Sequence, residues 1–328
     1  MNHRKSILRP LLLMGCLLVL HPFAKVASAQ AAGSISDKPG ASGKLNVYAS
    51  ILPLAFFVER IGRNHLEIHV MVGPGQSPAT YEPTSKQLVQ LAQSHVFFSI
   101  GVPFEKQLLP RIRKSFQTVD IVSTQAGIEL MPVSTNVAGV QEIKNVELSG
   151  PQHLNAAAHT HSHSEGELDP HIWLNPRLAA TIARNILEAL IRIDPSHSAE
   201  YTNNHRTLMT DLEELDRKIT EMLAPLEGEE FYVFHPAYGY FAEAYGLVQV
   251  SIERGGTSPG LKHLVDLIEK AKARKVRAIF IQPQFSKKSA ETIADEIGAD
   301  VVVMDPLSRD YLTNMKEMAV KIRKAIAN

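Results

Sequence analysis

Short apolar strands alternate with amphipathic helices in two separate blocks, and this alternation is the feature that most constrains the fold. In the first block, helical patterns begin at Pro53 and at Ser85. The strand-like segments of this block are 45–51, 65–73, 95–101 and 118–123. Because strands that alternate with helices are joined by crossovers, the pattern predicts a parallel sheet that is covered on both faces.

A second block of the same kind follows Pro225. Its strand-like segments are 230–235, 248–253, 276–282 and 299–305. Between the blocks, one helical pattern stops at Pro195, and another runs over 196–223, which is roughly 40 Å of helix. We interpret the longer helix as a rigid spine between two lobes rather than as a surface helix. The predicted fold class is therefore α/β, with two doubly wound parallel-sheet lobes joined by a single long helix.

The first 29 residues have the three parts of a secretory signal peptide. A basic start precedes an apolar run from Leu11 to Leu20 and small residues that end at Ala29. An apolar run of about ten residues is too short for a membrane-spanning helix, which needs about 20. Because the run continues past Cys16, cleavage after Ala29 is favoured over attachment of a lipid at Cys16. We therefore expect export to the periplasm.

Composition shifts divide the chain into five parts. A stretch rich in Gly, Ser, Pro and Ala follows the signal peptide, and such a stretch lacks the apolar residues needed for a core. A polar segment interrupts the first block between Val133 and Leu168. The parts are a signal peptide (1–29), a flexible tether (30–43), an N-terminal lobe (44–195), a linking helix (196–223) and a C-terminal lobe (226–328).

Charge and cysteine content limit the classes of ligand and partner. The chain has 34 Lys and Arg residues and 34 Asp and Glu residues, a balance that argues against nucleic acid bound through a basic surface. The only cysteine, Cys16, lies in the signal peptide, so the mature protein has neither a disulfide nor a thiolate ligand. Any bound metal must be held by nitrogen and oxygen.

Polar residues follow three strands of the second block, at the sheet edge where ligands bind in open parallel sheets. They are His235, Gln282 and Asp305, and His171 lies just before a helix. Two imidazoles and a carboxylate suit the tetrahedral coordination of Zn²⁺. Each group also has a structural alternative, since His235 can be a hydrogen-bonding residue and Asp305 a turn or helix N-cap residue. Their combination favours a metal site.

A histidine-rich segment lies within the polar stretch. Its histidines are His153, His159, His161 and His163. Their spacing, beside Glu165 and Glu167, is typical of loose metal chelation, although a solvated loop has the same composition. Because a flexible loop loses chain entropy when it orders around an ion, we expect this loop to feed or sense metal rather than to close the main site.

Five long segments carry a resemblance to a known family. They are GPGQSPATYEPTSKQLVQLAQSHVFFSIG, DPHIWLNPRLAATIARNI after the histidine-rich loop, VFHPAYGYFAEAYGL, IFIQPQFSKKSAETIADEIGA and VVVMDPL. Together they resemble the metal-specific solute-binding proteins of ABC transporters, the zinc and manganese group that includes the high-affinity zinc uptake proteins. The resemblance covers nearly the whole mature chain.

The resemblance implies two lobes joined by one long helix, with little movement on binding and with the metal at the lobe interface. It also implies that His171, His235 and Asp305 are ligands. Family members commonly have a further histidine where this chain has Ala79, so one coordination position needs water or a substitute group. Glu82 is one substitute to test, and a histidine of the 153–163 loop is the other.

The expected function is capture of zinc for an ABC importer, with the membrane permease as partner and with the protein as a monomer. Zinc is favoured over manganese because two imidazoles suit a borderline ion, and a manganese- or iron-binding member of the family is the alternative. Gln282 stands where relatives often have glutamate, which removes one charge near the site. Affinity should fall in acid, since both imidazoles must be neutral to bind.

Two functions of other classes compete with zinc carriage. Three protein ligands plus water is also the arrangement of a zinc hydrolase, but the chain has no HExxH motif and no clearly placed general base. A metal-dependent adhesin, in which the ion is structural, is the other alternative. We therefore expect a binding protein and not an enzyme.

Overall fold

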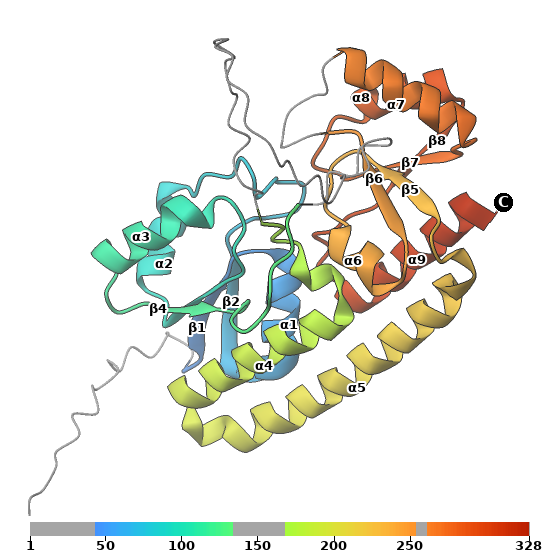
Figure 1. Cartoon of the computed structure of the whole chain (residues 1–328). Helices are drawn as coiled ribbons and strands as arrows, with labels where there is room; N and C mark the ends of the chain where they lie inside the picture. The colour runs from blue at the N-terminus through green and yellow to red at the C-terminus, as the bar shows by residue number, and fades with distance from the viewer. Residues whose placement is uncertain (1–42, 134–167, 254–260, 328) are drawn as a thin grey trace, which may run out of the picture. The chain divides into compact units, whose positions relative to one another are not determined.

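The computed structural model describes residues 43–133, 168–253 and 261–327, and Figure 1 shows the arrangement of its elements. The signal peptide and the histidine-rich loop lie outside the described residues. The first sheet has four parallel strands in the order β2-β1-β3-β4. These strands are β1 (Leu45–Ala49), β2 (Leu66–Val70), β3 (Val96–Ser99) and β4 (Asp120–Ser123).

Three of the helices that accompany the first sheet, α1, α2 and α4, begin at residues that favour helix starts. Pro53 lies in the first turn of α1, Thr84 and Gln87 form a capping box at the start of α2, and Asn175 caps α4. The helices are α1 (Leu52–Gly62), α2 (Ser85–Ala92), α3 (Glu105–Ser115) and α4 (Pro176–Ile193).

Helix α3 is absent from the sequence-based prediction, which places no helix between the third and fourth strands. Its segment is mostly polar and contains Pro110, and only Glu105, Leu108 and Ile112 are buried. Such a narrow apolar face gives a weak helical signal, and packing in the folded chain stabilises the helix instead.

The second sheet repeats the topology of the first, with four parallel strands in the order β6-β5-β7-β8. These strands are β5 (Glu230–Val233), β6 (Val248–Ser251), β7 (Ala278–Ile281) and β8 (Asp300–Val303), and the short helix α6 (Gly239–Ala244) lies between β5 and β6. Two parallel α/β sheets confirm the predicted fold class.

Alternate residues of the second sheet pack on opposite faces. Tyr232 and Ile279 join a core with residues of α7 (Leu261–Ala273) and α8 (Lys287–Ile297). Their neighbours Phe231 and Phe280 belong to the larger core, which continues into the first sheet and its helices. This alternation follows from the two-residue period of a strand, so both faces of the sheet are covered.

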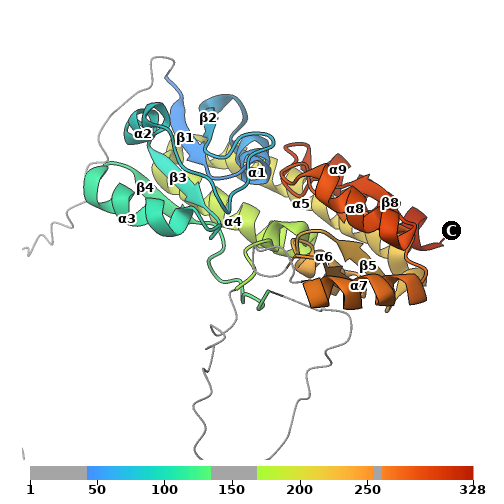
Figure 2. The same ribbon diagram turned by 90° about the horizontal axis from the view of Figure 1, so that it is seen from above.

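Helix α5 (Ser198–Leu223) runs alongside α4 and the C-terminal helix α9 (Tyr311–Ala327), as Figures 1 and 2 show. It also packs on α1, so it contacts helices that belong to both sheets. Its buried stripe includes Leu208, Leu212, Leu215 and Ile219, at the spacing of one helix face. These contacts agree with a spine between lobes, while the domain boundaries at 195 and 226 stay a prediction.

No helix within the described parts of the chain has the length and apolar content to cross a bilayer.

A buried carboxylate holds the loop after β3. Glu105 is 1% exposed, and its oxygens accept the backbone N–H groups of Ile100 at 3.0 Å and Gly101 at 2.8 Å. Burial raises the pKa of Glu105 from 4.5 to about 7, against the opposing effect of these hydrogen bonds. The folded protein therefore binds this proton more tightly than the unfolded chain does.

The raised pKa of Glu105 makes stability depend on pH. The raised pKa contributes to the free energy of unfolding, and this contribution is fully present below pH 4.5. It is lost as the pH rises through about 7, because the buried carboxyl group of Glu105 must then ionise. Relative to Glu105→Gln, the wild-type protein should lose about 3 kcal/mol of unfolding free energy over that range. Urea unfolding of both proteins at several pH values measures the difference. Parallel pH profiles for the two proteins would contradict the prediction.

Candidate metal centre

Two of the predicted ligands, His171 and His235, lie together although 64 positions separate them in the sequence (235 minus 171). Their ring centroids are 5.6 Å apart and their planes meet at 74°. Two imidazoles bonded through nitrogen to one tetrahedral zinc at about 2.0 Å have centroids roughly 5 Å apart. The spacing of the pair therefore suits a shared ion.

A buried carboxylate fixes the orientation of His171. The residue precedes the 3-10 turn Ile172–Leu174, and its Nδ1 lies 2.6 Å from Oδ1 of Asp169. The same oxygen accepts the backbone N–H of His171 at 2.9 Å, and Asp169 is only 1% exposed. Because an ionised carboxylate accepts hydrogen bonds only, Nδ1 must carry the proton, which leaves the lone pair on Nε2.

The second imidazole is held in the same way. His235 follows strand β5, and its Nδ1 lies 2.7 Å from Oε2 of Glu253, which follows the adjacent strand β6. Gln282, at the end of β7, donates from Nε2 to the backbone oxygen of His235 at 2.9 Å. The ring also stacks on Phe285, with centroids 5.1 Å apart. Three neighbouring strand ends thus position one side chain, and its Nε2 keeps the lone pair.

The two histidines differ from ordinary surface imidazoles in their surroundings. The side chains of His171 and His235 are 17% and 22% exposed, and those of Asp169 and Glu253 are 1% and 8% exposed. In such a partly buried environment, a carboxylate hydrogen-bonded to an imidazole makes the imidazole a stronger ligand and fixes the tautomer that binds a metal. The arrangement is chemically suited to hold a borderline divalent cation.

Asp305 lies on a segment that packs against the elements carrying both histidines. Trp173 donates to the backbone oxygen of Pro306 at 2.7 Å, and Tyr238 donates to that of Met304 at 2.9 Å. Oδ1 of Asp305 accepts the backbone N–H of Leu307 at 3.0 Å. Asp305 therefore stabilises a turn, which is the structural role that the sequence offers as an alternative to metal binding.

The carboxylate of Asp305 does not join the two imidazoles in one ligand group. It lines a hollow of about 640 Å³ together with Tyr48, His69 and Ser308, while neither His171 nor His235 lines it. Within residues 43–133, 168–253 and 261–327, no three His, Cys, Asp or Glu side chains are grouped closely enough to hold one ion. Ala79 and Glu82 are both exposed. The predicted histidines His153, His159, His161 and His163 lie outside the described residues.

Asp169 and Glu253 belong to the site, although the predicted ligand set does not include them. Asp169 is two residues before His171, so the motif DPH contains its signal. Glu253 is 18 residues from His235, and only the pairing of β5 with β6 brings the ends of these strands together.

A family model and solved structures match most of this chain. The model described as "zinc-uptake complex component A periplasmic" (ZnuA) matches residues 47–325. A crystal structure of ZnuA is 32% identical, with a TM-score of 0.74, over 86% of this chain and 99% of that one. The structure of a ZnuA deletion mutant with zinc bound gives the same identity and TM-score, over 86% of this chain and 98% of that one.

Curated relatives agree with this assignment. The zinc-binding protein AdcA of Streptococcus pyogenes serotype M3 is 27% identical to this chain over 86% of the chain's length. The matched region is 56% of the length of AdcA. The high-affinity zinc uptake system protein ZnuA of Bacillus subtilis is 28% identical over 84% of each chain. The chain therefore spans little more than half the length of AdcA. Because the family model runs from β1 to α9 and so includes both sheets, the chain belongs to the ZnuA family of zinc-uptake proteins.

Proposed function

We propose that this protein captures Zn²⁺ through Nε2 of His171 and Nε2 of His235 and delivers the ion to an ABC importer. One observation carries the proposal: two imidazoles 5.6 Å apart each have Nδ1 fixed by a buried carboxylate, so both lone pairs remain for one ion. Relatives named for zinc binding and zinc uptake support zinc as the cargo.

Asp305 is proposed as the carboxylate ligand of the same ion. Its segment is tied to the neighbourhood of both histidines through Trp173 and Tyr238, and in this proposal a reorientation of its side chain brings the carboxylate to the metal. The fourth position, where the family commonly has histidine and this chain has Ala79, is filled by water, Glu82 or a histidine of the 153–163 loop. Two nitrogen ligands favour Zn²⁺ over Mn²⁺.

Binding rather than catalysis fits the groups around the imidazoles. Asp169 and Glu253 each accept a hydrogen bond from an imidazole Nδ1, so neither serves as general base for a zinc-bound water. In this proposal, the mature protein acts as a monomer in the periplasm after removal of residues 1–29, and the permease of the importer is its partner.

Removal of either imidazole should abolish tight zinc binding. Loss of a direct ligand should weaken affinity by more than about 100-fold, since loss of an outer hydrogen-bond partner alone costs 10–100-fold. Competition with a chromophoric zinc chelator measures this change for His171→Ala and His235→Ala. Zinc at about 100 times the Kd should stabilise the wild type by about 2.7 kcal/mol, and neither variant should gain this. Deletion of residues 159–163 leaves both imidazoles in place and tests the fourth position: tight binding should be retained where water or Glu82 fills that position, and it should weaken where a histidine of the deleted segment does. Wild-type affinity in His171→Ala would contradict the assignment.

The carboxylates that accept hydrogen bonds from the imidazoles should affect zinc affinity nearly as strongly as the ligands do. Asp169→Asn and Glu253→Gln keep the size of each side chain but remove the charge that fixes the imidazole tautomer, so zinc affinity should fall about 10–100-fold. Glu230→Gln, in the same sheet but at the start of β5, is a matched control that should bind as the wild type does. The same chelator competition compares all four proteins. Unchanged affinity in both Asp169→Asn and Glu253→Gln would show that these carboxylates are only structural.

A further inference from the structure

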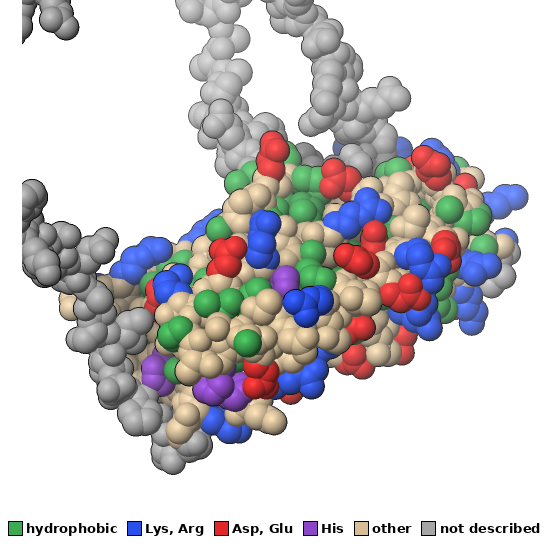
Figure 3. Space-filling model, turned by 90° about the horizontal axis from the view of Figure 1, so that it is seen from below, with side chains coloured by type: hydrophobic (Ala, Val, Ile, Leu, Met, Phe, Trp, Pro, Cys, Tyr) green, Lys and Arg blue, Asp and Glu red, His purple; other side chains and the backbone are tan. Residues whose placement is uncertain are grey.

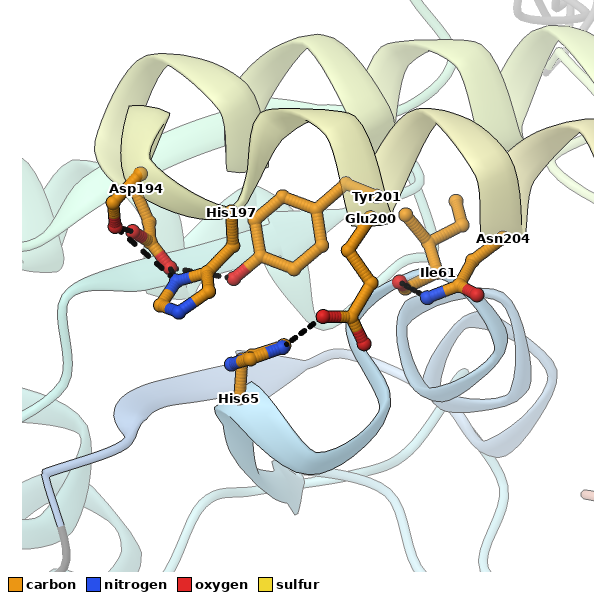
Figure 4. Close-up of polar contacts among 8 residues, drawn as sticks. Ile61, His65, Asp194, His197, Glu200, Tyr201 and Asn204 are labelled. Carbon is orange, nitrogen blue, oxygen red and sulfur yellow. Dashed lines mark hydrogen bonds and ion pairs between the residues drawn. The ribbon is translucent and has the colours of Figure 1, made fainter.

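A second pair of histidines, His65 and His197, lies in contact away from the candidate metal centre. Their ring centroids are 3.8 Å apart and their planes are tilted by 30°. His65 ends the 3-10 turn that follows α1, and His197 ends the 3-10 turn that precedes α5. Figure 4 shows one imidazole lying over the other, with Asp194 and Glu200 on opposite sides of the pair.

One nitrogen of each of these rings forms a hydrogen bond with a carboxylate. Nε2 of His65 lies 2.8 Å from Oε2 of Glu200, and Nδ1 of His197 lies 2.6 Å from Oδ2 of Asp194. An ionised carboxylate can only accept hydrogen bonds, so each ring must donate from the nitrogen that faces its carboxylate.

The remaining nitrogens, Nδ1 of His65 and Nε2 of His197, keep their lone pairs when the rings are neutral. Side-chain exposure is 24% for His65 and 42% for His197, so an ion can reach them from solvent. Figure 3 shows histidine side chains at the surface beside an acidic side chain. Two adjacent imidazoles, each hydrogen-bonded to a carboxylate, also occur at His171 and His235, where both carboxylates are buried, whereas Glu200 is half exposed.

We infer that His65 and His197 form a second Zn²⁺ site on the outer surface, separate from the pair that captures the cargo. Nδ1 of His65 and Nε2 of His197 are its ligands, Glu200 and Asp194 orient the rings, and water completes the coordination. The inference does not depend on the proposed function, because it uses none of the residues assigned to cargo binding.

Binding at this second site requires a small movement of the rings. Two imidazoles on one zinc have centroids roughly 5 Å apart, so the pair must open by about 1 Å from its present spacing. Both side chains are partly exposed and can rotate, but this change and the loss of the ring contact weaken binding. The positive end of α5 also opposes a cation, although Asp194 and Glu200 offset it. The site is therefore weaker than the main one.

The test uses full-length chain in which the other candidate zinc ligands are silenced by His171→Ala, His235→Ala and deletion of residues 153–163. Isothermal titration with zinc chloride should detect one zinc per chain in this background. Adding His65→Ala or His197→Ala should weaken that binding at least tenfold, and Glu200→Gln should weaken it roughly tenfold. Zinc binding that is absent from the background, or that is indifferent to both histidine substitutions, would overturn the inference.

A matched control and a direct measurement separate ligand loss from misfolding. His69→Ala removes a histidine of similar exposure, 26%, whose ring stacks on Tyr48 and contacts no other imidazole among the described residues, and it should leave the second site unchanged. In zinc-soaked crystals of the wild-type protein, anomalous scattering should place an ion about 2.0–2.1 Å from one nitrogen of each ring. Crystals that show zinc at His171 and His235 but none at His65 and His197 would rule out the second site and leave the proposed function intact.

Discussion

The hydrogen bond from an imidazole Nδ1 to a buried carboxylate is the interaction on which the candidate metal centre depends. It appears twice, from His171 to Asp169 and from His235 to Glu253, at 2.6 and 2.7 Å. In each case it fixes the tautomer and aims Nε2 away from the carboxylate. A buried carboxylate without such a donor would carry a large desolvation cost, so the imidazole also stabilises the acid beside it. The same hydrogen bond therefore sets the orientation of the imidazole and stabilises the buried carboxylate.

The sheet topology explains why these dyads meet. All strands of each sheet are parallel, so their carboxyl ends lie at one edge, and the pairing of β5 with β6 and β7 brings His235, Glu253 and Gln282 together there. Hydrogen bonds from Trp173 to Pro306 and from Tyr311 to Trp173 then connect the His171 segment to the chain that follows β8. A rigid edge of this kind holds the two imidazoles proposed as ligands in place, and such preorganisation reduces the entropic cost of binding.

Continuous packing distinguishes this molecule from a pair of loosely joined domains. The larger core includes residues of both sheets and of α4, α5 and α9, with Leu208 and Ile219 of α5 among its fully buried members. Relative movement of the sheets would disrupt this packing, whereas side chains at the edge, such as Asp305, can move without that cost. Completion of the ligand set by side-chain or loop movement is therefore less costly than closure of whole domains.

The sequence by itself determined the order of the strands and of the described helices other than α3, the two parallel sheets, and the positions of His171 and His235 before a helix and after a strand. These features follow from local periodicity and from the fixed location of strand ends in parallel sheets. Only the tertiary structure decided that Glu253 backs His235, that Asp305 lies outside the imidazole pair, that the polar segment 105–115 is helical, and that His65 touches His197. Periodicity reports which face of an element is buried, but contacts between distant side chains depend on how the elements pack.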